Sequence, residues 1–140
     1  MNSVVVQIHG VAIPNDGSDA QGQAAAGVYF GKGCLHNKLV SLPQGLQSTN
    51  SRAILVAIKT ALDELILMRH TMLDPRWKEV FIMTNSEYAR KSFHEWVWQW
   101  EVNGWQHIGR KGTVENLDLL QEIHGQLIHI ETALTMAVRF

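Results

Sequence analysis

The sequence has little of what marks a secreted, membrane or metal-rich protein. It contains a single cysteine, Cys34, which excludes an internal disulfide framework and a site built from several cysteines. No stretch approaches the roughly 18 apolar residues that a membrane-spanning helix needs. The N-terminal segment also lacks the basic and apolar regions of a signal peptide. These absences predict an intracellular protein without membrane contact, and they do not distinguish nucleus from cytoplasm.

An excess of positive charge is also missing. Twelve Lys and Arg stand against thirteen Asp and Glu, which gives a formal net charge of −1. Proteins that hold nucleic acid usually have a basic excess, because neutralising phosphates supplies much of their affinity. The balance therefore argues against a dedicated nucleic-acid binder, while it leaves room for a local basic patch.

The sequence patterns predict one mixed α/β domain over residues 1–140. A helix over 51–70 follows from apolar residues at helical spacing, with Asn50 or Ser51 as its N-cap. Gly104 is expected to end a later helix. The predicted order is strands over 3–13, 24–31 and 34–42, the helix over 51–70, a strand over 78–84, helices over 86–104 and 116–127, and a last strand over 128–138.

Several short segments, taken in this order, match the landmarks of one known family. TNSRAILVAIKTALDEL (49–65) is similar to its first helix, and TNSEY (84–88) to the Thr-Asp-Ser-x-Tyr that ends its fourth strand. The tryptophan-rich run from Tyr88 to VENLDLL (114–120) has the spacing of its handle region, and AGVYFG (26–31) is similar to its second strand. The family is ribonuclease H, which cuts the RNA strand of RNA/DNA hybrids. The resemblance implies a five-stranded mixed sheet with helices on both faces, from which the C-terminal helix is missing here.

The resemblance also implies four carboxylates that hold two Mg²⁺ ions. Mg²⁺ prefers oxygen ligands, and negative charge offsets the repulsion between the paired ions. At the corresponding positions this chain has His9, Ile54 and Asn85, and the fourth carboxylate belongs to the missing terminal helix. We therefore expect a degenerate site that has lost its two metals and needs no cofactor.

One alternative remains open for the first catalytic position. Asp16 begins an Asp-Gly-Ser motif like that of the family, but this alignment would put Pro14 inside a strand, where proline removes a ladder donor. His9 is therefore the favoured match. Glu87 and Glu131 lie near strand ends, but their spacing does not make them replacement ligands.

The handle region and the first helix supply the candidate contacts with other molecules. The handle has exchanged basic residues for neutral and acidic ones, so Trp98, Val102 and Ile54 are candidates for a protein interface. Thr49, Asn50, Arg110 and Lys111 are candidates for contact with nucleic acid. Helix capping explains Thr49 and Asn50 equally well.

These expectations favour a catalytically inactive ribonuclease H-like domain, a pseudo-nuclease that serves as a protein-interaction or assembly module or as a homodimer. A non-catalytic binder of RNA/DNA hybrid or double-stranded RNA is the alternative. A residual Mg²⁺-dependent hybrid nuclease that uses Asp16, Glu87 or Glu131 is the third hypothesis.

Overall fold

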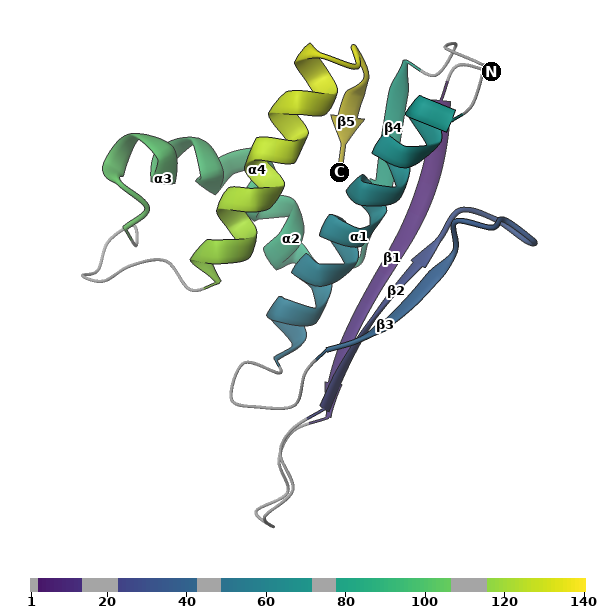
Figure 1. Cartoon of the computed structure of the whole chain (residues 1–140). Helices are drawn as coiled ribbons and strands as arrows, with labels where there is room; N and C mark the ends of the chain where they lie inside the picture. Colours follow the sequence, from purple (N-terminus) through teal and green to yellow (C-terminus); the bar gives the residue numbers. More distant parts are fainter. Residues whose placement is uncertain (1–2, 14–22, 43–48, 72–77, 107–115) are drawn as a thin grey trace.

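A computed structural model of the chain describes residues 3–13, 23–42, 49–71, 78–106 and 116–140 (Figure 1). Its five-stranded sheet has the order β3-β2-β1-β4-β5. β1 pairs antiparallel with β2 and parallel with β4, so the sheet is mixed. The strands are β1 (Ser3–Ile13), β2 (Gln23–Tyr29), β3 (Lys38–Ser41), β4 (Glu79–Met83) and β5 (Ala137–Arg139).

The helices pack on this sheet around the long helix α1. α1 contacts β1 and β2, and α4 packs along α1 (Figure 1). Within the described residues, no helix is long and apolar enough to cross a membrane. The helical elements are α1 (Asn50–Thr71), α2 (Glu87–Lys91), the π-helical segment η1 (Ser92–Trp96), α3 (Val97–Asn103) and α4 (Leu117–Thr132). The expected α/β class and five-stranded mixed sheet are thus confirmed.

The two faces of the sheet differ in cover. Successive side chains of a strand point to opposite faces, and on β1 Val6 and Ile8 are buried while Val5 and Val11 are exposed. Each described helix contributes buried apolar residues to one core cluster, which contains Val6 and Ile8. The described helices therefore cover one face of the sheet, whereas helices were expected on both faces. The expected loss of a C-terminal helix stays a prediction.

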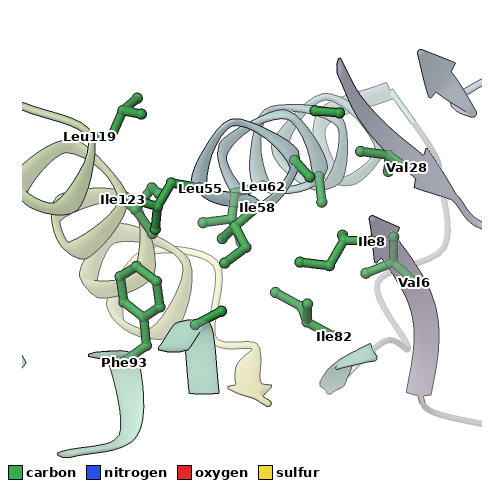
Figure 2. Packing of buried hydrophobic residues seen from close by; sticks show 14 of the residues in the cluster. Val6, Ile8, Val28, Leu55, Ile58, Leu62, Ile82, Phe93, Leu119 and Ile123 are labelled. Atoms are coloured by element: carbon green, nitrogen blue, oxygen red, sulfur yellow. The ribbon is translucent and has the colours of Figure 1, made fainter. Parts of the chain in front are cut away.

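The core lies between the sheet, α1 and α4. Figure 2 shows Ile58 and Leu62 of α1 facing Val6 and Ile8 of the sheet, with Ile123 of α4 close to α1. Burying one such side chain fully contributes about 1.5–3 kcal/mol. The helical spacing read from the sequence is confirmed, because its apolar positions 55, 58, 62 and 65 are all fully buried.

The connection between β2 and β3 is longer than predicted. The sequence placed Lys32 and Gly33 alone between the two strands, but residues 30–37 are all outside them. The side chain of Asn37 organises this segment by accepting from the backbone N–H of Phe30 at 2.7 Å and donating to the Gly31 carbonyl at 2.8 Å. Because the Asn37 side chain bonds back across six and seven residues, the Lys-Gly pair alone did not reveal the length of the loop.

The predicted strand over residues 128–138 is wrong in its first part. α4 continues to Thr132, and β5 spans only Ala137–Arg139. Leu120, Ile123 and Ile130 are fully buried and recur at helical spacing on the face that meets the core. The short alternation of Ile and His at 128–130 is compatible with both the strand period and the helix period. The burial of Ile130 in the core favours the helix.

The predicted helix over residues 86–104 is interrupted. η1 is a π-helical turn between α2 and α3, in which the backbone N–H of Val97 bonds to the Ser92 carbonyl. Gly104 ends α3 as expected, with a left-handed φ of 77° that glycine adopts without strain.

A bidentate ion pair joins α1 to the start of α4. The Nη2 of Arg52 lies 2.8 Å from Oδ2 of Asp118, and Nη1 lies 3.1 Å from Oδ1. This hydrogen-bonded pair raises the pKa of Arg52 and lowers the pKa of Asp118. Asp118 also lies in the first turn of α4, where a negative charge complements the helix dipole.

We predict that Asp118→Asn lowers the free energy of unfolding at neutral pH by at most about 1 kcal/mol, because the pair is partly exposed. The folded-state pKa of Asp118 is lowered, so its contribution is present above the unfolded pKa of about 4 and is lost as pH falls through the lower folded value. Urea unfolding between neutral and acidic pH should show the two curves converging at low pH. Glu95→Gln, at an exposed position, is the control, and parallel curves for Asp118→Asn and wild type would contradict the prediction.

Candidate functional site

β1 passes so close to the first turn of α1 that Gly10 has no room for a side chain. A Cβ at Gly10 would lie 2.4 Å from the backbone nitrogen of Ile54 and 2.6 Å from the carbonyl carbon of Ala53. Both neighbours are backbone atoms and cannot turn aside, so only glycine fits here. The contact places Ile54 next to the strand residue that follows His9.

The strand register brings Asn85 to the same edge. β1 and β4 are parallel, with Val5 opposite Phe81 and Gln7 opposite Met83. His9 lies two residues beyond Gln7, and Asn85 lies two residues beyond Met83. Because the two strands are parallel, His9 and Asn85 lie at the same end of the strand pair. His9 and Asn85 are exposed, while Ile54 is partly buried. The three positions chosen from the sequence therefore lie near one another along the backbone at this end of the sheet, and we call them the β1–α1 edge.

Thr49 and Asn50 hold the start of α1 in place, one within the helix and the other against β1. Thr49, and not the expected Asn50 or Ser51, caps the helix, because its Oγ1 accepts from the backbone N–H of Arg52 at 3.1 Å. The Oδ1 of Asn50 accepts from the backbone N–H of Ala12 in β1 at 2.6 Å. Both side chains have structural partners, and their predicted contact with nucleic acid stays a prediction. The Asn50–Ala12 bond spans 38 residues, and no local pattern announced it.

The carboxylates considered as replacement ligands do not lie together at the edge. Glu87 pairs with Lys91 at 3.3 Å and with Arg90 at 4.0 Å. Glu131 lines a pocket beside Trp98 that contains none of the edge residues. Three further candidates from the sequence, Asp16, Arg110 and Lys111, lie outside the described residues.

The handle tryptophans lie on two sides of the helical region. The rings of Trp96 and Trp100 lie 5.7 Å apart on the buried side. Trp98 points elsewhere and is 55% exposed, although its ring meets His124 edge-on at 5.5 Å. Val102 is also exposed. An interface through Trp98, Val102 and Ile54 stays a prediction. Ile54 lies at the edge and does not line the pocket that contains Trp98 and Glu131.

The β1–α1 edge does not fit a pair of Mg²⁺ ions. In the described part of the chain, no group of three or more His, Cys, Asp and Glu is arranged to hold a metal. His9 offers a ring nitrogen, Asn85 an uncharged amide oxygen and Ile54 no donor at all. Mg²⁺ requires oxygen ligands, and two dications need negative charge around them, which these side chains do not supply.

The sheet order, the close strand–helix contact and the helical handle define the fold class, which is the ribonuclease H fold. A foamy virus RNase H domain superposes with a TM-score of 0.67 at 18% identity, covering 97% of this chain and 76% of that one. A foamy viral protease-reverse transcriptase solved with dsDNA gives 0.68 at 18% identity, covering 96% and 78%. A type 1 RNase H with the type 2 active-site motif gives 0.63 at 23% identity, covering 99% and 62%. At these identities the likeness shows the fold.

The family model RNase H matches residues 9–134, and the chain belongs to the ribonuclease H family. Ribonuclease H of Methylococcus capsulatus is 39% identical over 77 residues, which cover 55% of this chain and 43% of the relative. Ribonuclease H of Idiomarina loihiensis is 32% identical over 108 residues, which cover 76% and 59%. The chain thus spans about half the length of the curated relatives it matches.

The hypothesis of a pseudo-nuclease that acts as an interaction module is wrong. The chain's relatives are named ribonuclease H, which denotes an enzyme family that acts on RNA/DNA hybrids and normally uses Mg²⁺. The hypothesis inferred inactivity from His9, Ile54 and Asn85 and from the expected loss of the terminal helix that would carry the fourth carboxylate. A poor metal fit at three positions describes those side chains and does not establish that the protein lacks activity.

We predict that Gly10→Ala destabilises the protein by about 1–3 kcal/mol, the usual cost of forcing an extra carbon into a filled space. Gly27→Ala is the matched control, since Gly27 pairs with His9 on the neighbouring strand and a Cβ there meets nothing within 4 Å. Removing a strand glycine there should be neutral or stabilising by up to about 1 kcal/mol. Urea unfolding measures both, and equal stability of the two variants would refute the tight β1–α1 contact.

Proposed function

We propose that this chain is a ribonuclease H domain that binds an RNA/DNA hybrid and serves cleavage of its RNA strand. The observation that carries the proposal is the family match over residues 9–134. The close contact at Gly10 adds support, because it sets β1 and α1 at the edge where the resemblance implies that the reaction takes place.

The proposed hybrid contact lies along the β1–α1 edge. His9 and Asn85 are exposed there. The first residues after the edge on α2 include two cations, Arg90 and Lys91, whose side chains are 59% and 42% exposed. Attraction between such cations and phosphates supplies affinity that does not depend on nucleotide sequence. Arg110 and Lys111 are proposed to extend this contact.

The metal requirement bears on where the carboxylates would lie. When bound in this family, Mg²⁺ ions activate the attacking water and stabilise the leaving oxygen. Because His9, Ile54 and Asn85 do not fit these ions, the proposal assigns the metal-binding carboxylates to residues outside the described ranges. Asp16 is the alternative first ligand that the sequence left open.

The remaining assignments stay predictions. They are a single domain over residues 1–140, an intracellular location, and a protein partner or self-association through Ile54, Trp98 and Val102. None of them is needed for recognition of a hybrid by the β1–α1 edge.

We expect the purified chain to cut a labelled RNA strand that is paired with DNA when Mg²⁺ or Mn²⁺ is present, and EDTA should stop the reaction. The same RNA strand without its DNA partner should remain intact, because the substrate is the hybrid. Gel electrophoresis of the labelled strand measures the products. Asp16→Asn tests the open ligand position, since retained cleavage would assign the first carboxylate elsewhere. Intact RNA in the hybrid with protein in excess and either metal present would overturn the proposed cleavage.

A further inference from the structure

We infer that the β1–α1 edge contacts the phosphate backbone of a hybrid without a divalent metal pair. The inference rests on the proposed recognition of a hybrid and specifies the chemistry of this one surface. It predicts that binding at the edge is independent of Mg²⁺, whichever residues serve the cleavage step.

The exposed surface around His9 is made of uncharged groups. Its cross-strand partner is Gly27, which leaves open space beside the ring. Gln7 and Met83 are register partners and are both exposed, and Asn85 follows Met83. None of these side chains carries a negative charge. No carboxylate belongs to this set.

The described acidic residues of the elements that form the edge have basic partners. Glu87, on α2 after Asn85, already pairs with Lys91 and Arg90. On α1, Asp63 is 2.9 Å from Lys59, and Glu64 is 2.6 Å from His36. On β4, Glu79 lies 3.6 Å from Arg139. These acids are engaged with basic side chains of their own, and none of them faces the edge as an unpaired charge.

The absence of unpaired carboxylates changes how a phosphate can approach this edge. A cluster of carboxylates repels the phosphate backbone until cations are bound among them, so affinity at such a cluster depends on the cation. An edge of amide, imidazole and hydrocarbon groups creates no such repulsion. Phosphates can approach it directly, and hydrogen bonds from Asn85 and His9 replace contacts through a metal.

The test is hybrid binding in EDTA and in Mg²⁺ at matched ionic strength, followed by fluorescence anisotropy, with the hybrid checked afterwards for integrity on a gel. The wild-type Kd should be the same within about twofold in the two conditions, because the matched salt removes the general screening difference. The variant His9→Asp/Ile54→Glu/Asn85→Asp should bind about tenfold more weakly in EDTA, owing to the added like charge. Mg²⁺ should restore its affinity.

Metal binding itself gives a second readout. The spectroscopic signal of free Mn²⁺ should fall more when the triple variant is added than when wild-type protein is added at the same concentration. Asn85→Asp alone is nearly isosteric and guards against misfolding of the triple variant. Gln121→Glu, at an exposed position on α4, adds the same charge elsewhere and should leave binding in EDTA unchanged.

The outcomes separate this inference from the proposed function. Wild-type binding that requires Mg²⁺ would overturn the inference while leaving hybrid recognition standing. Absence of wild-type binding in both conditions would overturn hybrid recognition and the inference with it. Equal wild-type binding in both conditions, combined with Mg²⁺-dependent binding by the triple variant, would establish the inference.

Discussion

The contact between Gly10 of β1 and the backbone of Ala53 and Ile54 in α1 is the constraint on which the other features depend. It fixes how closely the helix lies on the central strand, and so it sets the depth at which the buried face of α1 meets the sheet. The bond from Ala12 to Asn50 holds the same junction two residues further along β1. Arg52, two residues before Ile54, forms an ion pair with Asp118 of α4. The contact at Gly10 thus positions α1 on the sheet, and the ion pair of Arg52 with Asp118 links α1 to α4.

Much of this architecture could be predicted from local patterns. The helical pattern of apolar residues over 51–70 is long and regular, so the local prediction of a helix agrees with the tertiary packing. The failures are at short or ambiguous segments. Ile and His alternate at 128–130 in a way that suits strand and helix alike, and burial of Ile130 decides for the helix. The loop at 30–37 is held by Asn37, and the helix start by Thr49, and both depend on particular hydrogen bonds.

The location of the candidate site could be predicted from the sequence, but its function could not. Resemblance to the family singled out His9, Ile54 and Asn85, and the structure brings these positions to one edge through the Gly10 contact and the register of β1 with β4. The step from missing carboxylates to an inactive protein was not justified, because the relatives are ribonucleases H and the chain spans only about half of their length. Side-chain chemistry limits what these three residues do. It does not by itself decide what the protein does.

The central claim is that the β1–α1 edge is the surface that recognises an RNA/DNA hybrid. The most direct measurement is a titration of isotopically labelled protein with a hybrid, followed residue by residue through backbone amide NMR shifts. The account predicts that the largest changes occur at His9, Gly10, Ile54 and Asn85 and along the first turn of α1. Changes confined to the opposite part of the molecule, around Trp98 and Val102 on α3, with the edge unaffected, would contradict it.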